Sequence, residues 1–206
     1  MARPRAQDHT EKREAIYQTA ARLFAEHGYD GTSMSQIAEA CGVSKALLYH
    51  YYDNKEAVLF DIVDDHLERL LEAVGKVGEE HASPREKLEA LCIALLEAYR
   101  DADAEHKVQI NDLKRLPQAR QDELKAKERA LVAVFSDAIR GAVPSLGGGN
   151  PLLKPVTMSL FGMLNWQFLW FRPDGPISRR DFARLATQLV IEGATGVELE
   201  DLKRGD

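Results

Sequence analysis

TSMSQIAEACGVSKALLYHYYDNKEAVL, residues 32–59, is the stretch that decides the fold of this chain. Ser33 is followed three residues later by a glutamine, the spacing of a capping box, which predicts that a short helix begins there. Gly42 supplies the positive φ that a tight turn requires, and Ser44 is suited to cap a further helix, 45–52. The stretch therefore predicts two short helices joined by a turn, the proportions of a helix-turn-helix.

The faces of the second of these helices follow from a turn of about 100° per residue. With Leu48 directed toward the core, Ala46 and His50 point away from it, and Leu47 and Tyr49 flank that outer face. An α-helix fits the major groove of DNA, where small apolar groups meet thymine methyls and polar side chains meet base edges or phosphates. The outer face is therefore a candidate for reading DNA.

Charge is distributed in a way that permits this partner for one part of the chain. The 206 residues carry a net charge of −6, but residues 1–55 hold 7 basic and 7 acidic side chains, so the excess acid lies in residues 56–206. Nucleic acid therefore remains a possible partner for the N-terminal part alone. Lys55, at the start of the helix after residues 45–52, adds a cation beside free backbone N–H groups. Thr32 and Ser33 lie similarly at the start of the first of the two short helices, and all three are suited to phosphate.

Other classes of protein are disfavoured by composition. Hydrophobic residues make up 45% of the chain, as in globular proteins, and the longest nearly apolar stretch, 158–171, is too short for a membrane span. The first fifteen residues offer no secretory signal, so the expected location is the cytoplasm. Cys41 and Cys92 have no CxxC spacing, which argues against a metal site or a disulfide framework.

Nearly all of the remaining sequence has helical periodicity with capping residues at the segment starts. It predicts an all-α fold of about nine helices, preceded by a flexible arm that carries Arg3 and Arg5. Besides the two short helices, the expected segments are 10–27, 55 to the seventies, 83–99, 104–116, 118–142, 150–171 and 178–202.

Residues 32–59, with Leu23-Phe24 and Gly28-Tyr29 before them, closely resemble the DNA-binding signature of the TetR family of bacterial transcriptional regulators. The match covers about residues 10–60. It implies an N-terminal helix-turn-helix domain of three helices, residues 1–55 with an arm at 1–9, and a C-terminal helical domain, 56–206, for effector binding and dimerisation.

The resemblance also implies roles for individual residues. Tyr49, His50, Tyr51 and Lys55 match positions used on phosphates or bases, and Lys45 and Ala46 lie near the bases. Leu47 departs from the family, in which that residue is often small or hydroxylated. The complete set of candidate DNA-binding residues is Thr32, Ser33, Ser44, Lys45, Ala46, Leu47, Tyr49, His50, Tyr51 and Lys55.

The C-terminal part contains an aromatic helix with both tryptophans and a last helix rich in alanine and glycine. Small residues allow close helix approach, so these two helices suit a two-fold, four-helix dimer interface as in the family. The stretch FGMLNWQFLWFRP, 161–173, is similar to a subgroup that responds to acyl-CoA thioesters. The candidate ligand-binding residues are Tyr99, Phe135, Trp166, Trp170 and Arg172.

These features predict a homodimeric, ligand-responsive repressor that leaves a palindromic double-stranded DNA operator when it binds a hydrophobic effector, an acyl-CoA thioester. A regulator that senses a free hydrophobic compound or drug is an alternative, as is a ligand-independent structural DNA-binding protein. No GxSxG, HExxH or GxGxxG motif supports an enzyme, and no cofactor is expected. Asp61, Asp64, Asp65 and His66 are interpreted as a solvated helix face rather than a metal site.

Overall fold

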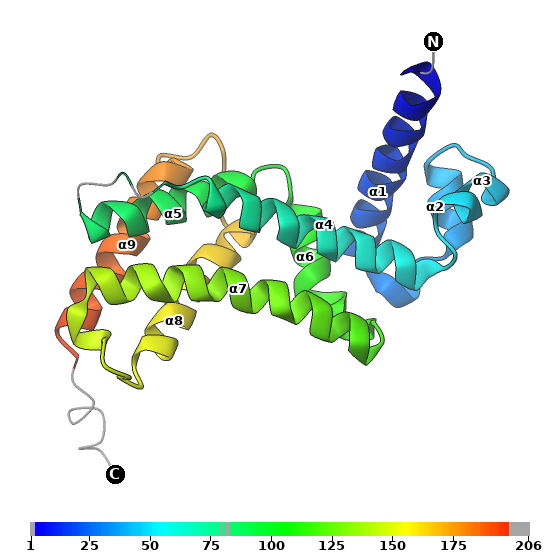
Figure 1. The fold of residues 1–206 in the computed structure, drawn as a ribbon. Coiled ribbons are helices and arrows are strands. Elements are labelled where there is room, and N and C mark those ends of the chain that lie inside the picture. The colour runs from blue at the N-terminus through cyan, green and yellow to red at the C-terminus, as the bar shows by residue number, and fades with distance from the viewer. Residues whose placement is uncertain (1–2, 79, 81–82, 198–206) are drawn as a thin grey trace. The chain divides into compact units, whose positions relative to one another are not determined.

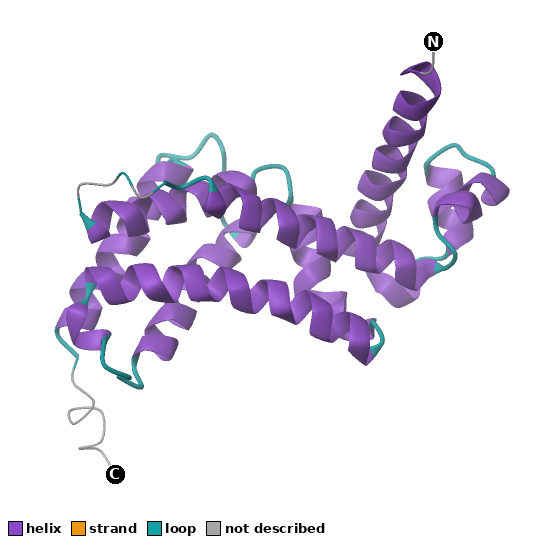
Figure 2. Cartoon of the chain, viewed as in Figure 1, coloured by secondary structure: helices purple, strands orange, loops and turns teal. Residues whose placement is uncertain are grey.

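The computed structural model describes residues 3–78, 80 and 83–197, which form nine α-helices and three short 3-10 helices without any strand in that part of the chain (Figures 1 and 2). None of the helices in the described ranges is both long enough and apolar enough to cross a membrane. The α-helices are α1 Arg3–Gly31, α2 Met34–Ala40, α3 Lys45–Tyr51, α4 Lys55–Gly75, α5 Pro84–Ala98, α6 Asp103–Asp112, α7 Gln118–Ala142, α8 Leu153–Asn165 and α9 Arg179–Thr195. The 3-10 helices are η1 Leu113–Arg115, η2 Pro144–Leu146 and η3 Trp166–Leu169.

Side-chain caps begin several of these helices, as the sequence predicts. The Ser33 side chain accepts a hydrogen bond from the Gln36 N–H at 3.3 Å, and the Gln36 side chain accepts one from the Ser33 N–H at 2.7 Å. Ser44 accepts from the Leu47 N–H at the start of α3, and Ser178 forms a second reciprocal box at α9. Gly42, between α2 and α3, has a φ of 65°. The predicted helix-turn-helix is therefore present.

The chain divides into two compact units, and α4 and α7 each contribute to both of them. Unit 1 contains residues 1–68 and 101–127, and unit 2 contains residues 69–100 and 128–206. This grouping differs from the predicted division between residues 55 and 56, because α6 packs on α1 and the segment from α6 to the start of α7 shares the core of unit 1. Val108 and Leu124, both fully buried, belong to that core.

A polar network inside unit 1 connects three of its helices. The Tyr52 hydroxyl, directly after α3, donates to the Asp61 carboxylate of α4 at 2.5 Å, and Arg13 of α1 pairs with the same carboxylate. Burial first, and then the neighbouring Asp61 carboxylate, raises the pKa of the Tyr52 hydroxyl above its usual range. Tyr52 is 6% exposed, so the end of α3 is fixed against α1 and α4 by a buried contact.

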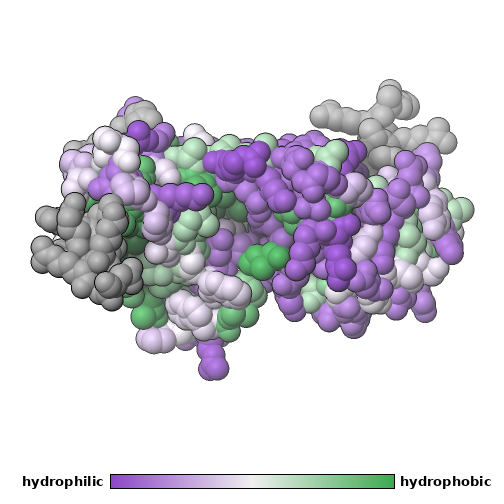
Figure 3. Space-filling view, turned by 90° about the horizontal axis from the view of Figure 1, so that it is seen from below, coloured by the Kyte–Doolittle hydropathy of each residue, from purple (hydrophilic) through white to green (hydrophobic). Residues whose placement is uncertain are grey.

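Unit 2 has a separate apolar core, in which α9 packs against both α5 and α8 (Figure 1). Phe135 of α7 is fully buried and meets Phe161 of α8 edge to face, with ring centroids 5.0 Å apart. Viewed from below, hydrophobic side chains, drawn in green, gather on the face of unit 2 on which α8 lies (Figure 3).

Several helix boundaries differ from the sequence-based expectation. α1 begins at Arg3 rather than near residue 10, so the expected flexible arm is helical from that residue, and the helical conformation breaks at Gly28, where φ is 75°. The long apolar helix expected over 150–171 is shorter: α8 ends at Asn165, and Trp166 begins the tighter turn of η3. α9 ends at Thr195, where Gly196 is its C-cap, rather than near residue 202 as expected.

Truncating Phe135 tests the core of unit 2. Because Phe135 is fully buried against Phe161, Phe135→Ala should lower the free energy of unfolding by about 3–5 kcal/mol. Val134→Ala, which shortens an exposed neighbour on the same helix, is the matched control and should change it by less than about 1 kcal/mol. Urea unfolding followed by circular dichroism measures both; equal effects would contradict the assigned core.

Cys92 should resist alkylation while the protein is folded. Its thiol is fully buried, and burial raises its pKa to about 12, so almost no thiolate exists near neutral pH. Cys41 is half-buried, with its pKa raised mainly by burial. Mass spectrometry after iodoacetamide treatment should show Cys92 modified only in denaturant, whereas rapid modification of the native protein would contradict this packing.

Candidate functional site

The outer face of α3 is exposed as the sequence predicts. Lys45, Ala46, Tyr49 and His50 are exposed, with Tyr49 at 44%, whereas Leu48 on the opposite face is fully buried. Leu47 and Tyr51 are half-buried at the two edges of this surface. The structure thus presents a short helix with a mixed apolar and polar face to solvent, which is the shape and chemistry that the major groove accommodates.

The two capping serines have different freedom to contact a phosphate. The Ser44 hydroxyl accepts the Leu47 N–H at 3.1 Å and keeps its own proton for another acceptor. The Ser33 hydroxyl both accepts from the Gln36 N–H and donates to the Gln36 side chain at 2.8 Å. Ser44 is therefore the better placed of the two to donate a hydrogen bond to DNA.

Thr32, a candidate DNA-binding residue, lies inside the unit rather than on its surface. It is 2% exposed, and its hydroxyl donates to the Gly28 carbonyl at 3.0 Å and lies 3.3 Å from the Leu23 carbonyl. The Thr32 side chain therefore hydrogen-bonds to backbone carbonyl groups near the end of α1. The expectation that its hydroxyl faces a phosphate does not match this geometry.

Lys55 has a role in the fold that the sequence did not reveal. Its ammonium donates to the carbonyls of Tyr29 at 2.7 Å and Thr32 at 2.8 Å, and it lies 4.1 Å from the centre of the Tyr29 ring. Three internal partners hold a half-buried cation at the start of α4. These partners leave the positive charge of the Lys55 ammonium in place, so a phosphate contact at this position would be an electrostatic attraction to that charge.

The acidic stretch of α4 is not a uniformly solvated face. Asp61 and Asp64 pair with Arg13 and Lys127, respectively, and His66 is 1% exposed, with its ring 5.7 Å from that of His106. Within the part of the chain that the structure describes, no three His, Cys, Asp or Glu side chains form a group able to hold a metal ion.

The five candidate ligand-binding residues fall into two environments within unit 2. Tyr99 is buried and its hydroxyl donates to the Asn165 side chain at 2.8 Å, and Phe135 belongs to the core. Trp166 and Trp170 are each 51% exposed, and Arg172 is also exposed.

Because α8 ends at Asn165, the two tryptophans do not lie one α-helical turn apart as expected. Trp166 stacks on Phe168 at 6.1 Å, whereas Trp170 meets Phe182 edge to face at 4.9 Å. The structure therefore does not bring these five residues into one described pocket. Near these side chains the Arg179 guanidinium lies 4.5 Å from the centre of the Phe171 ring.

Comparison with known proteins identifies the family. The model "Bacterial regulatory proteins, tetR family" matches residues 16–62, and the model "Tetracyclin repressor-like, C-terminal domain" matches residues 81–194, more than half of the chain. The chain belongs to the tetR family of bacterial transcriptional regulators. A TetR-family transcriptional regulator from Bordetella parapertussis is 35% identical in sequence, with a TM-score of 0.83 over 90% of this chain and 97% of that one.

Two further relatives of this tetR-family regulator carry functional descriptions. AibR, solved in complex with isovaleryl coenzyme A and operator DNA, is 29% identical, with a TM-score of 0.71 over 86% of this chain and 97% of that one. The transcriptional repressor KstR2 of Mycolicibacterium smegmatis is 25% identical over 186 residues, 89% of this chain and 91% of the relative.

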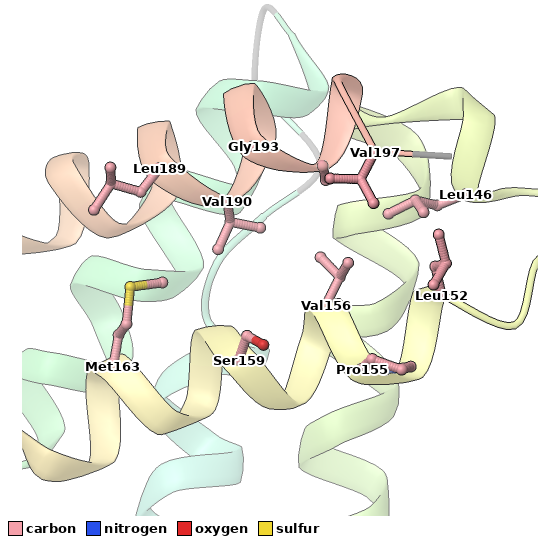
Figure 4. Close-up of a pocket in the computed structure, with 11 residues that line it drawn as sticks. Leu146, Leu152, Pro155, Val156, Ser159, Met163, Leu189, Val190, Gly193 and Val197 are labelled. Atoms are coloured by element: carbon pink, nitrogen blue, oxygen red, sulfur yellow. The ribbon is translucent and has the colours of Figure 1, made fainter. Parts of the chain in front are cut away.

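An apolar groove of about 380 Å³ runs between α8 and α9 of this tetR-family chain (Figure 4). Val156, Ser159 and Met163 of α8 point toward α9, and Val190 of α9 points back toward them (Figure 4). Its full lining is Leu146, Leu152, Pro155, Val156, Ser159, Met163, Leu189, Val190, Gly193, Ala194 and Val197. None of the five candidate ligand-binding residues lies in it, so this groove and those residues are separate features of unit 2.

Tyr49 provides the sharpest test of the α3 surface. Tyr49→Ala should weaken binding to operator DNA roughly ten-fold, because one base or phosphate contact contributes about 1–3 kcal/mol, while the melting temperature stays unchanged for an exposed side chain. Tyr49→Phe separates the hydroxyl from the ring. Fluorescence anisotropy with a labelled promoter fragment measures the affinity, and parental affinity in Tyr49→Ala would remove this residue from the interface.

Lys55→Met should behave differently from the Tyr49 variants. Because its ammonium holds two internal carbonyls, its loss should lower the melting temperature as well as the DNA affinity. An unchanged melting temperature, measured by differential scanning fluorimetry, would contradict the internal role that the structure gives to this lysine.

Proposed function

We propose that this chain is a dimeric repressor that binds a palindromic operator through α3 and releases it when a hydrophobic effector binds. The observation that carries the proposal is the two-sided character of α3. Leu48 is fully buried while Tyr49 and His50, its neighbours, are exposed, so the helix is held firmly on one side and free on the other. A groove-reading helix has these two requirements.

The groove between α8 and α9 supports the dimeric part of the proposal. A second copy placed there by a two-fold axis would cover Leu189, which is 55% exposed, and Val197, which is 41% exposed. Gly193, which is exposed, allows the close approach of another helix at this position. For the two α3 helices of such a dimer to enter successive major grooves, about 34–36 Å apart, the operator must have a palindromic sequence.

An acyl-CoA thioester is the effector class that the relative AibR supports. AibR was solved with isovaleryl coenzyme A and operator DNA together, and this chain resembles it over most of both lengths. Exposed apolar side chains at Trp166 and Trp170 suit an acyl group, and the exposed Arg172 suits a phosphate of the coenzyme. By favouring a dimer whose α3 separation no longer matches the grooves, the bound effector would lower operator affinity.

The deciding experiment titrates the protein against a labelled DNA fragment from upstream of its own gene, with an unrelated fragment as the control. Tight binding to the first fragment only, and release by one member of a panel of acyl-CoA thioesters, is the expected result. At 100 times its Kd, a bound thioester stabilises the protein by about 2.7 kcal/mol and so raises its melting temperature. A thioester that does this without releasing DNA would refute the release mechanism.

The matching free acids separate the two kinds of effector. A free acid that stabilises the protein and releases it from DNA to the same extent as its thioester would show that the coenzyme is not recognised. The effector would then be a free hydrophobic compound. Equal affinity for promoter and unrelated DNA, with no response to either set, would instead indicate a structural DNA-binding protein.

A further inference from the structure

The inner face of α8 continues beyond the end of that helix into η3, within unit 2. The buried residues of α8 include Thr157, Leu160 and Leu164, which follow one another at intervals of three and four residues. Gln167 comes three residues after Leu164, so the same spacing places it on the inner face, and it is 2% exposed. A position at which helical periodicity predicts an apolar side chain is therefore occupied by an amide.

The neighbours of Gln167 in η3 have the opposite distribution. Of the four described residues of η3, Gln167 alone is buried, whereas Trp166 is 51% exposed and Leu169 is 65% exposed. Large apolar side chains are usually inside a folded protein and glutamine is usually outside, so this segment reverses the common pattern. Burial of an amide lowers stability unless a hydrogen bond compensates for the lost contact with water.

The side-chain nitrogen of Gln167 has no such compensation within the chain. Among the described residues, this Nε2 atom is buried and has no hydrogen-bond partner. The main chain of the same residue is well paired, because its carbonyl accepts from the Trp170 N–H at 3.2 Å and from the Phe171 N–H at 2.9 Å. These two bonds hold the backbone of Gln167 in the turn that ends η3, so the inward direction of its side chain follows from the fold.

A second amide close by shows how unit 2 treats a buried polar group that is structural. The Asn165 side chain, two residues before Gln167, accepts a hydrogen bond at 2.8 Å from the hydroxyl of Tyr99, which is itself buried. Buried polar groups in folded proteins nearly always have a partner of this kind. A donor that is kept inside unit 2 without one points to a partner that is not part of the chain.

We propose that Gln167 recognises the effector: its side-chain amide donates a hydrogen bond to the carbonyl oxygen of the bound acyl group. A carbonyl oxygen accepts hydrogen bonds and has no proton to donate, which matches an unpaired N–H donor. In an acyl thioester this oxygen is uncharged and lies directly beside the apolar chain, so both can be buried together at moderate cost. The inference rests on the proposed function, which supplies the effector class, and it adds a specificity-determining residue to the five candidates.

The first test compares ligands with and without the carbonyl. Isovaleryl-, octanoyl- and benzoyl-CoA are each paired with the thioether in which a methylene group replaces the carbonyl, and calorimetric titration of the full-length protein measures their affinities. The thioester that binds most tightly should bind at least roughly ten-fold more tightly than its thioether, because the thioether leaves the buried donor unpaired. Equal affinities, or no binding by any of the three thioesters, would overturn the inference.

The second test removes the amide. Gln167→Met keeps an unbranched side chain of similar length, and its preference for the thioester over the thioether should fall to about two-fold or less. Its melting temperature without ligand should rise, because an unpaired polar group is no longer buried. Gln118→Met makes the same change at an exposed glutamine at the start of α7, and it should keep the parental ligand preference and melting temperature.

Two results for Gln167→Met would each overturn the inference. An unchanged preference for the thioester would remove the amide from the ligand contact. A lower melting temperature without ligand would show that the amide is already satisfied in the free protein, by a bound water or by the chain, and that its role is structural.

The inference and the proposed repressor can fail separately, because these ligand titrations contain no DNA. A parent protein that prefers the thioester but does not bind the promoter fragment would overturn the repressor and leave the role of Gln167 in place. A parent that binds the promoter and is released by a thioester, while Gln167→Met keeps the full ligand preference, would overturn the role of Gln167 alone.

Discussion

The complete burial of Leu48 is the constraint on which the DNA-binding arrangement depends. A seven-residue helix has little stability of its own, so α3 keeps its shape and direction only through the core to which it is anchored. The Ser44 cap at one end and the Tyr52 hydroxyl on Asp61 at the other prevent rotation about that anchor. The exposure of Tyr49 and His50 is the geometric result of burying Leu48.

The core that receives Leu48 is not built by the first three helices alone. Val108, Leu116 and Leu124, from a region more than fifty residues further along the chain, share it with α1 and α2. A fragment ending near residue 55 would expose the apolar surfaces that these residues cover. The helix-turn-helix of this protein is therefore completed by sequence outside the segment that carries its family signature, which places the DNA-binding helices and α6 in one cooperative unit.

Local chemistry explains what could be predicted from the sequence. The Ser33 capping box, the positive φ of Gly42 and the two faces of α3 each depend on residues within a few positions of one another, and the structure confirms them. The bounds of α7 were also predicted correctly, because Pro117 and Pro144 interrupt the helical pattern on either side of it.

Long-range contacts explain what could not be predicted. The burial of Thr32 and the internal hydrogen bonds of Lys55 depend on where α1 ends in space, which helical periodicity does not specify. The end of α8 at Asn165 follows from no proline or glycine; there the Asn165 side chain accepts the hydrogen bond of a residue 66 positions away, Tyr99. The roles of the candidate ligand-binding residues remain predictions for the same reason, since a pocket is formed by distant segments.

The placement of the aromatic residues gives the protein an intrinsic optical probe. Its two tryptophans, Trp166 and Trp170, are half-exposed and lie within and directly after η3. Ultraviolet emission from the indole rings therefore originates from one short segment of unit 2. The wavelength and intensity of that emission report the polarity around η3, whereas α2 and α3 contain no tryptophan and do not contribute to it. Changes in the environment of η3 can therefore be followed in solution without attaching a dye.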